Sequence, residues 1–460
     1  GDHNFQSGLV HLWIGADSFC FQQSEGVLMG PVIKVTPETS RIDAPIQITA
    51  AGLVPRERVT IRTRVVDGAL REWESVAIVD ADGAGAVDLS RMAPCEGSTY
   101  LGVDGQGLLW SMKGPDQSKF FTRNLPVELE YRSELLRGDS VIASAHFRRH
   151  FGEDVTYEWV HEPPVVGTFA RPNDGLPHPG VLLLHGSESA DLAAAATLIA
   201  SEGYSVLALR WFGCEDRPPH LVNVDLNDVD DVVTYMYNDD RVLGDRIAVI
   251  GMSRGAELAL EVAADNVNVG LTIALSPSSI RQAGIGENYS FKDPAWVRDG
   301  EPLEWVSGGS GFGMMVMYLS SVIRRKPMRQ TRGFLEDLHK KVEAVERSAI
   351  PVEKCNGPLV LIVGDDDGLW PSQEYAERIA GRLADAEWPG TLRVECLPGA
   401  GHFVGLPYAL PSLPPMCILK PTLLFSIDFG GSASANAESA RKVWQIVQEE
   451  LFQWCASLNY

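Results

Sequence analysis

The sequence predicts an α/β protein in which an antiparallel β-sandwich precedes a mostly parallel sheet with helices on both faces. The first observation is a change of rhythm near residue 165, from closely spaced strand patterns to alternating strands and helices. The second is segment 246–255, where a short apolar run leads into a glycine-flanked serine and then into strong helix formers. The third is the length of 460 residues, which is more than one ordinary domain needs and suits two.

The composition limits the partners that we expect. With 61 acidic and 39 basic residues the formal net charge is −22, which argues against nucleic acid or an anionic membrane surface as the main partner. The seven cysteines are scattered without C-x-x-C spacing, so we expect reduced thiols, a cytoplasmic location and no zinc site. No apolar run has the roughly 18 residues of a membrane-spanning helix. We expect neither a signal peptide nor a peroxisomal C-terminus. The sequence gives no indication of an oligomeric state.

The N-terminal part is expected to hold a leader and then the sandwich. Residues 1–30 show no clear period, and Met29 would make a natural start, so we expect an added or poorly ordered leader. Residues 31–165 form the predicted immunoglobulin-like sandwich, because apolar and polar residues alternate there over short runs between turns. The expected strands are 46–50, 59–65, 72–79, 127–131, 141–147 and 155–159.

Residues 166–460 are expected to form the second, catalytic domain. Buried strands are predicted at 181–184, 204–209, 247–250, 269–275, 359–363 and 392–397. Helices are predicted between them, with the clearest at 191–201, 226–236, 256–262, 372–386 and 437–454. Segment 277–350 breaks this rhythm and is read as an insertion over the strand ends.

The strand, turn and helix around residue 253 have the pattern of a nucleophile elbow. Gly251, Ser253 and Gly255 give the G-x-S-x-G spacing, in which the glycines allow a turn too tight for side chains on either side of the serine. Such a turn exposes the hydroxyl of Ser253 at the start of a helix, where the amide of Arg254 can donate to a developing oxyanion. The context of strand and helix favours a functional motif over a chance match and predicts an α/β-hydrolase fold with Ser253 as nucleophile.

A serine nucleophile needs a base and an acid that orients the base, and in this fold they follow the serine in the order acid, then histidine. Three aspartates, 365–367, follow the predicted strand 359–363, and we choose Asp367 as the acid. At least two of the three are expected to serve only a solvated turn or a helix cap. His402 lies in a glycine-rich loop after the strand 392–397, and it is the only histidine that follows the acid, so it is the expected base.

The second oxyanion donor is expected from the loop after the strand 181–184. Either Gly186 or Ser187 supplies it, and the sequence does not distinguish them. Gly186 permits a close approach of the backbone, but it is equally compatible with an ordinary turn.

A basic cluster stands out within the expected insertion of this acidic chain. It is either a solvated face, as most charge runs are, or a site that captures the phosphates of a substrate. Its members are Arg324, Arg325, Lys326, Arg329 and Arg332.

Over nearly its whole length from about residue 31, the chain resembles the acyl-CoA thioesterase and bile acid-CoA:amino acid N-acyltransferase family. The motifs that carry the resemblance are Gly52-Leu53-Val54-Pro55, Gly107-Leu108-Leu109-Trp110, Glu215-Asp216, 251–257, 364–370, Gly401-His402-Phe403 and Pro407-Tyr408. The resemblance implies a sandwich followed by an α/β-hydrolase domain, and attack on the thioester carbonyl of an acyl-CoA. It also implies a triad of Ser253, Asp367 and His402, the residues already chosen.

The expected activity is hydrolysis of an acyl thioester through a serine acyl-enzyme, without a metal or redox cofactor. The alternative is transfer of the acyl group to an amine or alcohol. In the resembled family the N-acyltransferases carry cysteine at the nucleophile position, whereas this chain has Ser253. An oxygen ester reacts with amines much less readily than a thioester does, so hydrolysis is the favoured prediction.

Overall fold

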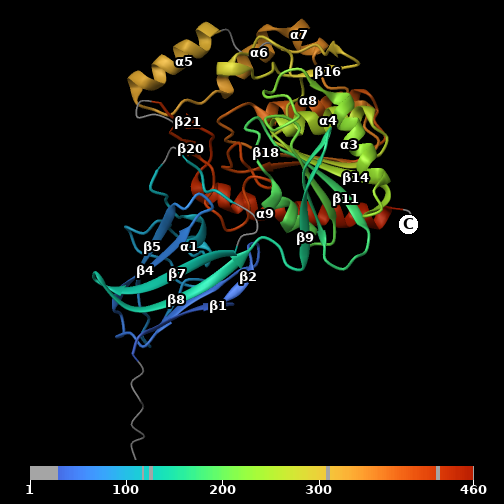
Figure 1. The fold of residues 1–460 in the computed structure, drawn as a ribbon. Coiled ribbons are helices and arrows are strands. Elements are labelled where there is room, and N and C mark those ends of the chain that lie inside the picture. The colour runs from blue at the N-terminus through green and yellow to red at the C-terminus, as the bar shows by residue number, and fades with distance from the viewer. Residues whose placement is uncertain (1–29, 117–118, 124–127, 307–310, 421–424, 459–460) are drawn as a thin grey trace, which may run out of the picture.

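The computed structural model describes residues 30–116, 119–123, 128–306, 311–420 and 425–458 (Figure 1). The leader expected over residues 1–30 lies outside the described residues except for Gly30. The sandwich lies at one end of the molecule, and the long C-terminal helix α9 (Ala433–Ser457) runs between it and the α/β part (Figure 1).

The sandwich consists of a five-stranded sheet with the order β2-β8-β7-β4-β5 and a three-stranded sheet with the order β1-β3-β6. Its strands are β1 (Val32–Thr36), β2 (Thr39–Arg41), β3 (Gln47–Ala51), β4 (Arg58–Val66), β5 (Glu72–Asp80), β6 (Val87–Asp88), β7 (Glu128–Arg137) and β8 (Ser140–His150). In β4 every second residue is buried, as the alternation predicts, so Val59, Ile61 and Val65 face the core. The pairing is antiparallel except between β2 and β8, which run parallel.

The second part contains an eight-stranded sheet with the order β19-β18-β15-β14-β11-β12-β10-β9. Its strands are β9 (Val155–Glu162), β10 (Val165–Pro172), β11 (His178–Leu184), β12 (Ser205–Leu209), β14 (Val242–Met252), β15 (Val269–Leu275), β18 (Leu359–Gly364) and β19 (Leu392–Leu397). The six strands that are neighbours in the order β19-β18-β15-β14-β11-β12 all pair in parallel. This sheet with its helices has the α/β-hydrolase architecture.

Strand β9 corrects one sequence-based expectation. The run 155–159 was assigned to the sandwich, but β9 pairs antiparallel with β10 over its whole length, at the edge of the eight-stranded sheet. An exposed strand alternates in the same way at the edge of either sheet, so its periodicity does not reveal its partner. Since the change of sheet falls between β8 and β9, we propose that the division between the two domains lies there and not at residue 165.

Helices cover both faces of the large sheet. On one face lie α2 (Ala193–Ala200) and α9, and on the other lie α3 (Leu226–Asn238), α4 (Arg254–Asp265) and α8 (Ser372–Asp385). Because neighbouring residues in a strand point to opposite faces, Leu183 packs with the first group and Leu182 with the second. The first of these cores is continuous with that of the sandwich, so the two parts share apolar packing. No helix in the described part of the chain is both long and apolar enough to cross a bilayer.

The expected insertion 277–350 contains short strands and a layer of helices above the sheet (Figure 1). Its elements, with the strand β13 that pairs with it, are β13 (Val224–Asp225), η1 (Glu287–Tyr289), β16 (Trp296–Arg298), β17 (Glu301–Pro302), α5 (Gly311–Arg324), α6 (Thr331–Lys340) and α7 (Val342–Arg347). The hydroxyl of Thr331 donates to the carbonyl oxygen of Asp367 at 2.6 Å, just past the end of β18. The insertion is therefore anchored at the carboxyl end of the sheet. The remaining short elements are α1 (Gly107–Trp110) in the sandwich region, and η2 (Val352–Lys354), β20 (Ile418–Leu419) and β21 (Ile427–Asp428) in the α/β part.

Candidate active site

Ser253 occupies a strained turn between β14 and α4. Its φ of 58° and ψ of −120° lie in a region that residues other than glycine rarely adopt. The amide of Ser253 donates to the carbonyl oxygen of Leu275 at 2.9 Å. The flanking glycines are sterically required. A Cβ on Gly251 would lie 2.1 Å from the carbonyl oxygen of Gly255, and one on Gly255 would lie 2.4 Å from the carbonyl oxygens of Leu184 and His185. The turn is thus a nucleophile elbow in its geometry as well as in its sequence.

The side chain of Arg254 points away from the turn into the protein. Its guanidinium lies 3.1 Å from a carboxylate oxygen of Glu257 and donates to the carbonyl oxygen of Gln282 at 3.2 Å. Glu257 also accepts a hydrogen bond from Trp296, so the insertion is tied to the helix that follows the elbow. The amide of Arg254 remains at the helix start, where a developing negative charge is stabilised.

Asp367 and His402 form a buried pair. Nδ1 of His402 lies 2.8 Å from Oδ2 of Asp367, and the second carboxylate oxygen accepts from the amides of Leu369 and Trp370. Both side chains are almost inaccessible to solvent. Because the carboxylate accepts from Nδ1, that nitrogen carries the hydrogen and Nε2 is the basic one.

The other two aspartates have different partners. Asp365 accepts from the amide of Gly399 at 2.6 Å, and Asp366 accepts from Arg329 and from the amide of Gly431. Of the three aspartates in this turn, Asp367 is the one that contacts His402.

His402 and Ser253 are fastened to adjacent residues at the end of one strand. The amide of Ser253 donates to Leu275, and the hydroxyl of Ser276 donates to the carbonyl oxygen of His402 at 2.6 Å. Nε2 of His402 is buried and has no hydrogen-bond partner among the residues that the structure describes. This nitrogen is therefore available to accept a proton from a serine or from water.

The loop after β11 contains a network that the sequence reasoning missed. The amide of Gly186 donates to the hydroxyl of Tyr408 at 2.5 Å, and that hydroxyl donates to Oε1 of Glu188. Of the two expected oxyanion donors, the Gly186 amide is thus engaged by a side chain, whereas Ser187 is half-buried in the same loop. A carboxylate two residues past Gly186 was visible in the sequence, but nothing there indicated that Tyr408, 220 residues further on, would hold it.

Sandwich residues reach this network. The guanidinium of Arg123 donates to the carbonyl oxygens of Pro407 and Tyr408. Burial lowers the pKa of Arg123 to about 10, while the carboxylates of Glu188 and Asp191 act in the opposite direction. The N-terminal part of the chain therefore supports the side of the site on which Tyr408 lies.

The predicted basic cluster is divided. Arg329 pairs with Asp366, and Arg332 pairs with Glu336 on the next turn of α6. Arg324, Arg325 and Lys326 are exposed at the end of α5 and form no ion pair with any residue that the structure describes.

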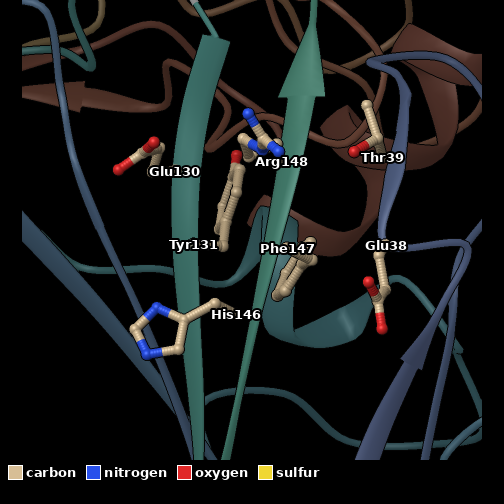
Figure 2. A pocket seen from close by; sticks show the side chains of 7 residues that line it. All are labelled: Glu38, Thr39, Glu130, Tyr131, His146, Phe147 and Arg148. Carbon is tan, nitrogen blue, oxygen red and sulfur yellow. The ribbon is translucent and has the colours of Figure 1, made fainter.

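A depression of about 300 Å³ on the sandwich is a poor alternative site (Figure 2). His146, Glu130 and Arg148 extend from β7 and β8 there, and the stacked rings of Tyr131 and Phe147 form part of the lining. Neither serine nor cysteine lines it, and none of Ser253, Asp367 and His402 does.

Two family models match the chain. The one described as "Acyl-CoA thioester hydrolase/BAAT N-terminal region" matches residues 43–162, and the one described as "BAAT / Acyl-CoA thioester hydrolase C terminal" matches residues 224–454.

Curated relatives are similar over most of their length. Acyl-coenzyme A thioesterase 1 of Rattus norvegicus is 28% identical over 419 residues, which are 88% of this chain and 92% of the relative. Acyl-coenzyme A thioesterase 2, mitochondrial, of Mus musculus is 29% identical, over 90% of this chain and 88% of the relative. Acyl-coenzyme A amino acid N-acyltransferase 1 of Mus musculus is 28% identical, over 90% and 95%.

Among solved structures, a putative dienelactone hydrolase from Klebsiella pneumoniae covers 65% of this chain and 98% of its own at 16% identity, with a TM-score of 0.37. Esterase B from Lactobacillus rhamnosis covers 66% and 86% at 14% identity, with the same TM-score of 0.37.

Proposed function

The chain belongs to the acyl-CoA thioester hydrolase and BAAT family, and we propose that it hydrolyses acyl-CoA or a related acyl thioester with Ser253 as nucleophile. The observation that carries the proposal is the buried hydrogen bond between His402 and Asp367, beside a strained serine elbow. The names of the relatives support the substrate class, since they are thioesterases and an N-acyltransferase that act on acyl-coenzyme A.

In the proposed reaction Nε2 of His402 takes the proton of Ser253 as the hydroxyl oxygen attacks the thioester carbonyl. The tetrahedral intermediate collapses by breaking the carbon–sulfur bond, and His402 returns the proton to the departing thiolate. Water then enters, gives a proton to His402 and attacks the acyl-serine ester. The free acid leaves and the proton returns to Ser253. Asp367 holds the imidazole in the tautomer that both halves need.

Transfer to an amine or alcohol is the second candidate, supported by the similarity to an N-acyltransferase. The serine disfavours it, because the acyl group is then stored as an oxygen ester, which amines attack slowly. Breakdown depends on an acceptor that His402 activates, and water is the most abundant one.

For the leaving group, we propose that Arg324, Arg325 and Lys326 hold the phosphates of CoA. These three cations are exposed and unpaired among the described residues, whereas Arg329 and Arg332 already have acidic partners. Phosphate recognition by an Arg cluster is a common arrangement and suits an otherwise acidic protein.

We also propose a reducing compartment, such as the cytoplasm, as the place of action. Five of the described cysteines are free thiols, namely Cys95, Cys214, Cys355, Cys396 and Cys417.

The experiment is a product analysis with purified protein. A panel of acyl-CoAs and acyl-pantetheines is incubated with free-thiol detection, in the presence and absence of glycine, taurine and a simple alcohol, and products are identified by mass spectrometry. Release of thiol together with free acid supports hydrolysis. Mostly conjugated product would establish transfer instead, and no thiol release from any thioester would refute the proposed substrate class.

A further inference from the structure

Glu188 lies in the loop after β11, on the side of Gly186 that faces the nucleophile. A Cβ placed on Gly186 would lie 2.9 Å from Oε2 of Glu188 and 3.5 Å from Cβ of Ser253. The carboxyl oxygen and the serine therefore flank one and the same point. A tetrahedral intermediate on Ser253 carries its oxyanion two bonds from the serine oxygen, so a group this close to the side chain of Ser253 is a candidate to contact it.

The two carboxyl oxygens of Glu188 have different roles. Oε1 accepts the hydrogen bond from the hydroxyl of Tyr408, and this hydroxyl is itself fixed by the amide of Gly186. Oε2 is the atom on the side of Ser253. The side chain is thus held by one oxygen and has the other on the side of Ser253, while the amide of Gly186, one of the two alternative donors expected there, holds Tyr408.

The surroundings favour the neutral form of this carboxyl. Desolvation of the carboxyl, which Tyr408 holds against the loop, raises the pKa of Glu188 to about 7, although the residue as a whole is exposed to solvent. Nearby backbone amides and the imidazole of His402 act in the opposite direction and do not cancel the effect. Arg123 from the sandwich, which lies within electrostatic reach of both Glu188 and Asp191, is a further charged group nearby, and its positive charge favours the carboxylate. At and below neutral pH a large fraction of Glu188 therefore carries a proton.

We propose that the protonated carboxyl of Glu188 is the second donor of the oxyanion hole, opposite the backbone amide of Arg254. The proposal rests on the proposed function, since it concerns the intermediate formed on Ser253. With Tyr408 donating to Oε1, the acidic hydrogen sits on Oε2 and points at the oxygen that gains charge. An effective donor lies roughly 2.7–3.1 Å from that oxygen, and carboxylic acids kept neutral by their surroundings fill this role in other enzymes.

Ionisation of Glu188 reverses the effect. The carboxylate has no hydrogen to donate, and its negative charge faces the developing oxyanion. Since the neutral acid is the active form, the rate contributed by this group is present below a pH of about 7 and is lost as the pH rises through that value.

The test compares pH profiles for wild type, Glu188→Gln and Glu188→Ala, with Glu438→Gln as the control for loss of an exposed carboxylate on α9. Two readouts are recorded on both sides of pH 7, namely acyl-CoA hydrolysis and the rate at which a fluorophosphonate labels Ser253. Labelling forms the same kind of anion and needs no thioester. The final extent of labelling and a thermal unfolding curve measure how much of each variant is folded.

We expect wild type and Glu438→Gln to lose rate above neutral pH in both readouts. Glu188→Gln keeps a weaker, neutral donor, so it is several-fold slower at low pH and shows no alkaline loss. Glu188→Ala should lose about 10²–10³-fold in rate, the usual cost of one oxyanion donor.

Two results would overturn the role of Glu188. One is a folded Glu188→Ala protein as fast as wild type, and the other is an alkaline loss that persists in Glu188→Gln. If wild type is labelled at Ser253 with the expected pH dependence and yet cleaves no acyl thioester, the proposed function fails and the role of Glu188 stands.

Discussion

The ring of Phe120 lies edge-on against the ring of Phe403, with 6.3 Å between their centroids and 67° between their planes. Phe120 belongs to the sandwich part of the chain, and Phe403 directly follows His402. Phe120 also contacts Phe429, with 5.8 Å between the centroids of the two rings. The carbonyl oxygen of Phe429 accepts a hydrogen bond from the amide of His402. The sandwich is therefore part of the support for the loop that holds His402, the proposed base.

Removing this support should affect activity as well as stability. Phe120→Ala empties one side of the Phe403 ring, and because Phe120 is half-buried we expect a loss of about 1–2 kcal/mol in the free energy of unfolding. Turnover should fall several-fold at a temperature where the variant is folded, since the His402 loop is less well fixed. Tyr157→Ala, which removes an exposed ring from β9, serves as the control in both the unfolding and the kinetic measurements. Equal turnover in folded Phe120→Ala and wild type would show that the contact is only structural.

The triad variants test the proposed roles directly. Ser253→Ala should fold normally and lose thioester turnover by about 10⁴–10⁶-fold, because the nucleophile is gone. Asp367→Asn should also cost heavily, since the amide cannot hold the same tautomer of His402, whereas Asp365→Asn should cost little, because Asp365 contacts Gly399 and not the imidazole. Steady-state kinetics with a thiol reagent measure all three. Substantial turnover in Ser253→Ala would exclude the assignment of the nucleophile.

The elbow glycines give a prediction about stability. Gly255→Ala places a Cβ 2.4 Å from two carbonyl oxygens of the neighbouring β11 strand end, so the backbone must shift and we expect a loss of about 1–3 kcal/mol together with activity. Gly381→Ala is the matched control, because nothing lies within 4 Å of its Cβ on helix α8. The control should gain about 0.5–1 kcal/mol from the lower backbone entropy of alanine in a helix. Chemical denaturation of the two variants gives both values, and unchanged stability of Gly255→Ala would contradict the packing at the elbow.

Charge reversal at the end of α5 tests the proposed CoA contact. Changing Arg324, Arg325 and Lys326 to Glu should raise KM for acyl-CoA and leave acyl-pantetheine unaffected, because only the former carries the nucleotide phosphates. The effect should shrink with added salt, which screens exposed charges. Lys340→Glu, a change at another exposed cation on α6, should alter KM little. If both substrates respond equally to the triple change, the cations form only a solvated face.

Much of the architecture follows from local signals in the sequence. Alternating side chains give a strand its two faces, as at Val59 and Ile61, and continuous apolar runs mark strands buried on both faces, as at 181–184. The elbow was readable because its packing requires glycine two residues before and two residues after Ser253. The choice of Asp367 and His402 followed from the order of residues in the fold, and the structure brings these two together.

Other features depend on which distant segments meet, and no local pattern encodes that. Polar and apolar residues alternate in β9 as they do in a sandwich strand, yet β9 pairs with β10. Backbone hydrogen bonds at the edge of a sheet do not depend on side-chain identity, so the alternation does not specify the partner strand. In the sequence the five residues of the basic cluster are indistinguishable. In the structure two of them have acidic partners, because Arg329 pairs with Asp366 and Arg332 pairs with Glu336.

Glu188 shows the limit most clearly. The sequence by itself determined the elbow turn and the class of fold, because both are set by the conformations and burial of adjacent residues. Only the tertiary structure decided that Tyr408 holds the carboxyl of Glu188 beside Ser253 and that surrounding protein raises its pKa. Desolvation and a hydrogen bond between residues 220 positions apart arise from packing in three dimensions, so they exist only once the chain has folded.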